Sequence, residues 1–238
     1  MLPKQITCYL PSKIMKQTSN ELKIDNETLN RADNVKFLGI RIDEALSWAD
    51  HIEYCRRKVS CGLFALNAVK KCLLTDNLKM LYHSLIHPYL TYGIMLWGSA
   101  YKTHLHKLAV IQKKAVRCIT NSKFNEHSAP LFAKLQIPTL SDIYMIELHV
   151  GKFVYLVNNK QIPEQLQEIY TQNNDIYNYY THNISNFHMH PIKIDVVFRS
   201  FIYQGPSMWH KLPETIKQSR TVARFGSKLK KMYISEYQ

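Results

Sequence analysis

The chain has 238 residues, 46% of them hydrophobic, and its 31 Lys and Arg residues against 18 Asp and Glu residues give a net charge of +13. This apolar content predicts a globular chain of one domain or two small ones. No two of the seven glycines stand two positions apart, which excludes a G-x-G-x-x-G turn and argues against nucleotide-fold enzymes. The positive charge instead favours a polyanionic partner, with nucleic acid as the leading candidate.

The sequence indicates an intracellular protein, nuclear or cytoplasmic, that does not bind a membrane. No strongly apolar stretch reaches the ~18 to 20 residues that span a bilayer, and no apolar segment of a secretory signal follows Met1. The cysteines are odd in number and lack C-x-x-C spacing, so we predict reduced core thiols rather than disulfides or a zinc site. They are Cys8, Cys55, Cys61, Cys72 and Cys118.

Short apolar runs separated by Pro and Asn predict two or three short strands within residues 1–42. From Ser47 the apolar residues recur every three or four positions, which predicts a long helix over about 47–71. Ser47 and Asp50 have the spacing of a capping box at the start of this helix.

Further helices follow from the same apolar spacing. A second helix is predicted from Thr75 until Pro88 kinks or interrupts it, and a third covers about 105–119. Ser141 is predicted to cap a fourth long helix, and Pro163 to open a fifth.

The chain after residue 170 has a less regular pattern. Residues 171–190 are rich in Asn, Tyr and His without an apolar period, which predicts a long flexible surface loop. Alternation over 192–198 predicts a short strand, and Gln204-Gly205-Pro206 is predicted to break the chain. A last helix is predicted over 221–233.

Basic residues are concentrated between residues 54 and 125, where 12 bases occur and Asp76 is the only acid. Such a cluster can neutralise backbone phosphates, whereas the alternative is a solvated helix face. The length of the acid-poor stretch favours nucleic-acid binding. Six candidates for phosphate contact neighbour apolar positions on two helices and can point toward one groove. They are Arg56, Arg57, Lys58, Lys113, Lys114 and Arg117.

The residues offer little for catalysis. No Asp-Asp pair occurs, whereas two-metal polymerases and nucleases need clustered carboxylates. For Asp43-Glu44 we favour a structural role at a helix start over metal binding. His83 and His87 lie one turn apart, but Ser84 stands where H-E-x-x-H has its glutamate, so we favour structural histidines over zinc ligands.

A series of short motifs occurs in order over about 35–238. They are Val35-Lys36-Phe37-Leu38-Gly39-Ile40-Arg41-Ile42-Asp43, Leu46-Ser47-Trp48-x-x-His51-Ile52, Leu81-Tyr82-x-Ser84-Leu85-Ile86-x-Pro88-Tyr89-Leu90-x-Tyr92-Gly93, Trp97-Gly98, Gln112-Lys113-Lys114-Ala115-x-Arg117, Leu131-Phe132-x-x-Leu135 and Gln204-Gly205-Pro206-x-x-Trp209-x-x-Leu212-Pro213. Together they resemble the region after the palm of reverse transcriptases from jockey-like non-LTR retrotransposons, which are RNA-directed DNA polymerases of transposable elements.

This resemblance implies that Phe37-Leu38-Gly39 is the primer-grip turn and that the three basic helices are the thumb. It also implies a truncated fragment, because the family's metal-binding Tyr/Phe-x-Asp-Asp box lies upstream of the primer grip and only 36 residues precede Phe37. No catalytic residue, metal site or cofactor is carried over, since Mg²⁺ belongs to the missing palm. The sequence departs from the family at Lys4-Gln5, where Lys-Thr is usual, and at His210, which replaces the common Asn.

We therefore expect a mainly α fold in three parts. Residues 1–42 would be a palm remnant with the primer-grip turn, 43–125 a basic three-helix thumb-like bundle, and 126–238 a C-terminal helical region. The expected function is binding of RNA, DNA or an RNA/DNA hybrid without enzyme activity. A separate palm-containing polypeptide is a further expected partner, which would make the chain one subunit of a split polymerase. The alternative is a helical protein-interaction module that does not bind nucleic acid.

Overall fold

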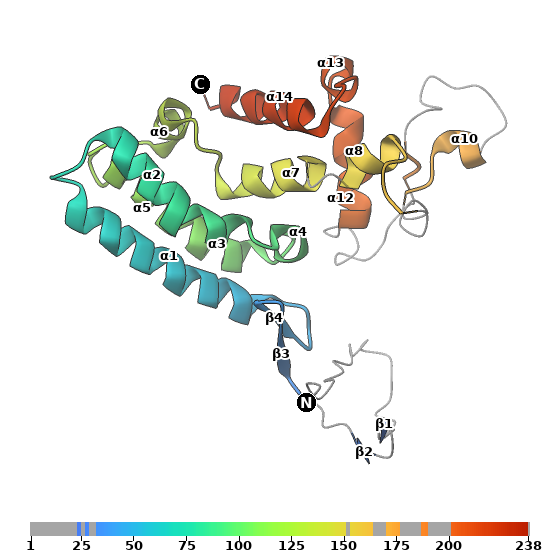
Figure 1. Ribbon diagram of the computed structural model, residues 1–238, viewed down its shortest axis with the longest axis horizontal. Coiled ribbons are helices and arrows are strands. Elements are labelled where there is room, and N and C mark those ends of the chain that lie inside the picture. Colours follow the sequence, from blue (N-terminus) through green and yellow to red (C-terminus); the bar gives the residue numbers. More distant parts are fainter. Residues whose placement is uncertain are drawn as a thin grey trace.

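A computed structural model describes residues 23–24, 27–28, 32–150, 153–163, 170–176, 187–189 and 201–237. Within these residues the chain is mainly helical, with two short antiparallel hairpins, as the sequence predicts (Figure 1). None of the described helices is both long and apolar enough to cross a bilayer. The helix predicted after Pro163 and the strand predicted over 192–198 lie outside the described residues.

Two hairpins precede the helices. Strand β1 (Lys23–Ile24) pairs with β2 (Glu27–Thr28), and β3 (Asn34–Phe37) pairs with β4 (Ile40–Asp43). The second hairpin leads directly into the first helix, so its position is set by the start of the helical bundle.

Three long helices form this bundle: α1 (Ala49–Val69), α2 (Thr75–Leu85) and α5 (Lys102–Ile119). The short helices α3 (His87–Thr91) and α4 (Ile94–Trp97) connect α2 to α5. Helices α1 and α5 both run from the end near β4 and α4 toward the end near α6, so they are parallel neighbours (Figure 1). The three predicted helices of this region are therefore confirmed.

The bundle core continues beyond the third helix. Gln112 of α5 is buried, and its amide donates to the Tyr82 hydroxyl and to the Pro138 carbonyl, both at 3.0 Å. The Gln112 amide oxygen accepts from the Leu140 N–H at 2.8 Å. The same hydrophobic cluster extends to Tyr144, well past residue 125.

The remaining helices form a second layer and a second core. They are α6 (Ser128–Leu135), α7 (Leu140–Val150), α8 (Phe153–Asn158), α10 (Asn173–Ile176), α12 (Phe201–Lys211), α13 (Glu214–Lys217) and α14 (Val222–Ser235). Helix α7 lies between the bundle and α14 and contacts both (Figure 1). A separate buried cluster that includes Trp209 and Phe225 joins α8, α12, α13 and α14.

The start of α1 differs from the prediction. Trp48 is the N-cap residue, with a left-handed φ of 63°, and no side chain caps the helix. The Asp43 carboxylate instead accepts hydrogen bonds from the N–H groups of Ser47 (2.8 Å) and Trp48 (2.7 Å). The predicted Ser47–Asp50 capping box is therefore wrong: Trp48 and not Ser47 is the N-cap residue, and the two amides just before the helix bind the Asp43 carboxylate, four and five residues earlier.

Two predictions after residue 135 are also wrong. Helix α7 is capped by Thr139, whose hydroxyl accepts from the Asp142 N–H at 3.3 Å, and not by Ser141. Gly205-Pro206 lies inside α12 rather than breaking the chain. A Cβ at Gly205 would lie 2.3 Å from the Tyr170 hydroxyl oxygen, so close packing with Tyr170 outweighs the local preference against helix.

The predicted loop at 171–190 is only partly described. Its described residues include the single turn of α10 and a bridge between Gln172 and Phe187. Phe187 is buried in the second core, where its ring contacts Tyr170 and Trp209. The polar composition of this segment does not indicate that Phe187 is buried.

The cysteine prediction holds for two of the described residues. Cys55 and Cys118 are buried free thiols, and burial raises the pKa of Cys55 to about 12. Cys61 and Cys72 are exposed, so their prediction as core residues is wrong. Cys8 lies outside the described residues.

Candidate nucleic-acid interface

The residues that resemble a primer grip form the tip of hairpin β3–β4. Leu38 and Gly39 both have positive φ, 47° and 84°, which is the pattern of the type I′ turn that suits two-residue hairpins. A leucine in this region costs about 1–2 kcal/mol, and such strain is often retained at functional sites. Phe37 and Leu38 are 62% and 73% exposed. The tip therefore presents two large apolar side chains to solvent.

Contacts with the α3–α4 connection hold this tip in place. The Tyr92 hydroxyl donates to the Leu38 carbonyl oxygen at 2.5 Å. Gly93 has a φ of 64°, and a Cβ there would lie 2.5 Å from Ile40 Cδ1, so the glycine allows β4 to approach. The turn is consequently fixed to the bundle although its own side chains are exposed.

His51 holds the other side of the hairpin. The Arg41 N–H donates to His51 Nδ1 at 3.4 Å, and the His51 ring lies edge-on to Trp97 with centroids 5.7 Å apart. Burial, and then the charge of Arg41, lowers the pKa of His51, which keeps the ring neutral and able to accept. The Trp48-x-x-His51-Ile52 motif thus has a structural role: it joins hairpin to helix.

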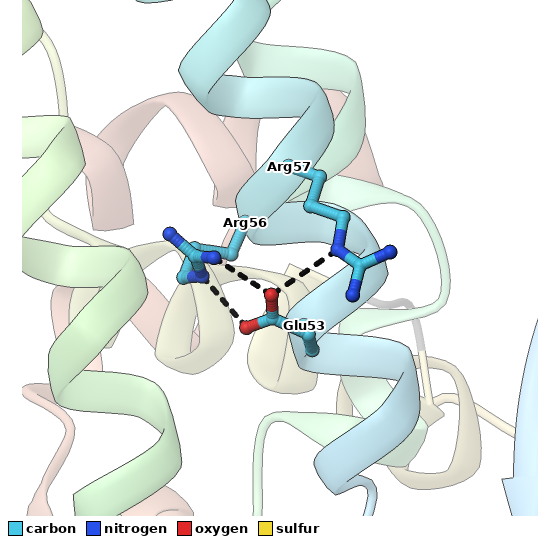
Figure 2. Close-up of polar contacts among 3 residues, drawn as sticks. All are labelled: Glu53, Arg56 and Arg57. Carbon is cyan, nitrogen blue, oxygen red and sulfur yellow. Dashed lines mark hydrogen bonds and ion pairs between the residues drawn. The ribbon is translucent and has the colours of Figure 1, made fainter.

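Arg56 and Arg57 share one carboxylate on α1. Figure 2 shows Glu53 between them: Arg56 donates through Nε (2.6 Å) and Nη2 (2.7 Å), and Arg57 donates through Nε (3.2 Å). The hydrogen bond from Arg56 is the main cause that lowers the pKa of Glu53 to about 2. The carboxylate stays ionised and offsets one of the two positive charges.

Lys58 lies on another side of α1. It stands one turn before Gly62, whose Cα faces Ile86 and the end of α2. Its ammonium lies over the Tyr54 ring, with Nζ 5.8 Å from the centroid. Lys58 is therefore directed away from the side of α1 that meets α5.

A contact between α1 and α5 shows which basic residues of the two helices lie opposite each other. Cys118 Sγ of α5 donates to Asn67 Oδ1 of α1 at 3.3 Å. Arg56 and Lys107 each stand eleven residues before these partners, which is about three helical turns. Because the helices are parallel, Arg56 and Lys107 lie at the same level on facing stripes, and Lys114 follows on the Lys107 stripe one turn before Cys118.

Lys113 and Arg117 are placed differently. Lys113 stands one turn after Ala109, which lines a cavity of about 270 Å³ against Leu140 and Tyr144 of α7. Arg117 Nε donates to the Glu126 carbonyl oxygen at 2.8 Å, which ties it to the loop after α5. The structure therefore does not bring all six predicted residues to one groove.

One group of basic side chains lies on the α1–α5 seam or, in the case of Arg57, beside it through the Glu53 carboxylate shared with Arg56, and we call its members the seam cations. They are Arg56, Arg57, Lys107 and Lys114. Lys107 was not among the predicted site residues, because its position opposite Arg56 depends on the register of two packed helices. The spacing of apolar residues within a single helix does not contain that register.

The histidine pair lies at the junction of α2 and α3, next to α14. The rings of His83 and His87 lie 5.0 Å apart between centroids, and Lys230 of α14 lies near both. In the described part of the chain, His87 Nδ1 is buried without a hydrogen-bond partner. No group of three or more His, Cys, Asp or Glu side chains among the described residues is arranged to hold a metal ion.

Among curated proteins, the chain is similar to polymerases of Drosophila mobile elements. The chain is 27% identical over 122 residues to the RNA-directed DNA polymerase from mobile element jockey of Drosophila funebris, covering 50% of this chain and 13% of that protein. It is 24% identical over 155 residues to the probable RNA-directed DNA polymerase from transposon BS of Drosophila melanogaster, covering 63% and 17%. For the corresponding protein from transposon X-element the values are 23% over 166 residues, covering 64% and 18%.

The matched region is thus less than a fifth of the length of these relatives. No protein-family model and no solved structure matches the chain. Over 50–64% of its length, the chain is related to the RNA-directed DNA polymerases of jockey-like non-LTR retrotransposons.

Proposed function

We propose that the chain is a fragment of a retrotransposon reverse transcriptase that binds an RNA/DNA hybrid or a related duplex through a thumb-like surface. The surface consists of the seam cations and the apolar tip formed by Phe37 and Leu38. One observation carries the proposal: Lys107 and Lys114 lie exposed on the α1–α5 seam, and no carboxylate in the described residues pairs with either.

The chemistry of this surface fits a polyphosphate backbone. Lysine and arginine side chains that neutralise phosphates release condensed counterions, which gives affinity for all sequences. The seam cations stand on two long helices whose buried faces fix their backbones. A surface of this kind would hold a duplex while another domain performs the chemistry. This is the role of a thumb in a polymerase such as those named for the relatives.

Salt dependence tests this proposal. The full chain should bind a fluorescent RNA/DNA hybrid at low salt, and the logarithm of the binding constant should fall linearly with the logarithm of salt concentration, by about 0.9 per phosphate contact. Absence of binding at low salt would favour the alternative, a helical protein-interaction module whose basic face is only solvated.

We further propose that the chain alone does not polymerise. The sequence contains no Asp-Asp pair, and two-metal phosphoryl transfer depends on clustered carboxylates. Template-directed incorporation by the purified chain with Mg²⁺ would overturn this. Incorporation that begins only after a palm-containing polypeptide is added would support a split polymerase.

A further inference from the structure

A large aromatic side chain is exposed beside the seam cations. Phe64 of α1 is 77% exposed, although a phenylalanine on a core-forming helix is normally buried. It stands two turns after Arg57 on the same outward stripe and three residues before Asn67, the residue that contacts α5. Lys114 stands one turn before Cys118, the partner of Asn67, so Phe64 and Lys114 lie at the same level across the seam.

We propose that Phe64 stacks on an unpaired base, and that the chain therefore prefers hybrids that carry a single-stranded extension next to the duplex. This inference rests on the proposed function and specifies the class of nucleic acid that the same surface takes. The occupant is argued from charge: Arg57 stands two turns before Phe64 on the same stripe, Lys114 stands at its level on α5, and Glu53, the acid one turn before Arg57, is already paired with Arg56 and Arg57.

The physical basis is the combination of a ring with flanking cations. Binding sites for single strands pair a cationic track for the backbone with aromatic side chains on which bases stack. Stacking needs an unpaired base, because the faces of a paired base are already covered by its neighbours in the duplex. Phosphate contacts by the seam cations would act on paired and unpaired regions alike, whereas Phe64 would act only on the extension.

The test compares three probes and four proteins. The probes are a blunt RNA/DNA hybrid and the same hybrid with an unpaired extension, placed on either strand in separate samples, that contains 2-aminopurine. The proteins are the full chain, Phe64→Ala, Phe64→Tyr, and Met80→Ala as a control, since Met80 is 65% exposed on α2 and lies off the seam. Circular dichroism on the same samples verifies the fold.

The full chain should bind one of the extended hybrids at least about fivefold more tightly than the blunt one, because base–aromatic stacking has that magnitude. Phe64→Ala should lose this advantage and the quenching of 2-aminopurine, and should bind the blunt hybrid as before. Phe64→Tyr should retain both effects, and Met80→Ala should behave as the unaltered chain.

Two kinds of outcome would overturn the inference, and they separate a failure of stacking from a failure of nucleic-acid binding as a whole. Equal binding of blunt and extended hybrids, or an advantage that persists in Phe64→Ala, would refute the stacking role and leave duplex binding in place. Failure of the unaltered chain to bind any of the hybrids would refute the proposed function together with the inference.

Discussion

At the residue scale, Glu53 limits the charge that α1 can offer to phosphate. Its carboxylate is paired with both Arg56 and Arg57 (Figure 2). A phosphate that reaches these arginines must compete with a partner that is already in contact. Glu53 therefore sets the balance between an internal ion pair and an external one.

Glu53→Gln should raise the affinity for an RNA/DNA hybrid. The substitution removes one negative charge and leaves two guanidinium groups without a carboxylate, so the slope of log binding constant against log salt should become steeper by up to about 0.9 for each arginine that gains a phosphate. Unchanged affinity and slope in a folded variant would indicate that the arginines do not touch the ligand.

His87 should make stability depend on pH. Burial, followed by the charges of His83 and Lys230, lowers the pKa of His87 to about 4, whereas the unfolded value is about 6.5. Protonation therefore favours the unfolded state: the contribution is complete above about pH 6.5 and is lost as the pH falls through about 4. The expected loss is on the order of 2 kcal/mol, because water that still reaches the ring screens part of the effect.

Urea unfolding at several pH values between about 7 and 4 measures this contribution. His87→Gln should reduce the fall in unfolding free energy, since the substituted side chain does not titrate. A variant whose stability falls with pH as steeply as that of the unaltered chain would contradict the assignment.

At the element scale, Gly98 allows the bundle to pack against α7. A Cβ at this position would lie 2.2 Å from Tyr144 Cδ2 and 2.5 Å from the Ile94 carbonyl oxygen. The second of these atoms belongs to the backbone and cannot move aside cheaply. The Trp97-Gly98 motif thus combines a buried ring with a glycine that lets Tyr144 of α7 pack closely.

Gly98→Ala should lower the unfolding free energy by about 1–3 kcal/mol through overpacking. Gly39→Ala is the matched control, because its Cβ would meet only Tyr92 Cε1 at 3.7 Å and its cost comes from the positive φ alone. Denaturant unfolding compares the two. A loss no larger for Gly98→Ala than for Gly39→Ala would show that α7 has room to shift.

The sequence predicted the long elements well because their signals are local. Apolar spacing indicates α1, α2 and α5, and the last helix begins where it was predicted, with Thr221 as a cap that accepts from the Arg224 N–H at 3.2 Å. The start of α1 and the cap of α7 were not predicted, because Asp43, which binds the amides just before α1, and Thr139, which caps α7, lie before the apolar-periodic residues by which the helices are recognised. Pro206 was predicted to break the chain, but it lies inside α12, where the neighbouring Gly205 packs closely against Tyr170.

At the scale of the whole molecule, buried polar contacts join the bundle to the segment that follows it. Gln112 satisfies Tyr82, Pro138 and Leu140 at once, so a chain that ended at residue 125 would leave a buried amide with only one of these partners. Unpaired buried polar groups are costly, about 1–3 kcal/mol each. We therefore propose that the folding unit includes α6 and α7.

Expression of two fragments tests this boundary. Residues 43–150 should unfold cooperatively, whereas residues 43–125 should be less stable or lack a cooperative transition, as followed by circular dichroism in urea. Equal stability of the two fragments would place the boundary at 125 and make the Gln112 contacts dispensable.

The residues of the candidate site could be predicted only in part from the sequence. Basic residues on α1 and α5 were identified from their density, but Lys107 and Phe64 became recognisable only when the register between the helices was known. Lys58 and Lys113 were predicted to share the groove, but Lys58 lies over the Tyr54 ring and Lys113 stands one turn after Ala109 on the α7 side of α5. Composition indicates the kind of ligand, whereas the packing of one helix against another determines which side chains can meet it.

The most direct test of binding at the α1–α5 seam removes two positive charges from the seam side of α5 and, in a second variant, two from another side of α5. Lys107→Ala with Lys114→Ala changes the seam, while Lys102→Ala with Lys113→Ala changes the α7 side by an equal charge. In hybrid binding titrated against salt, the seam pair should weaken binding and reduce the log–log slope by about 0.9 per contact, and the control pair should change the slope little. Equal effects of the two pairs, or none from the seam pair in a folded protein, would contradict binding at the α1–α5 seam.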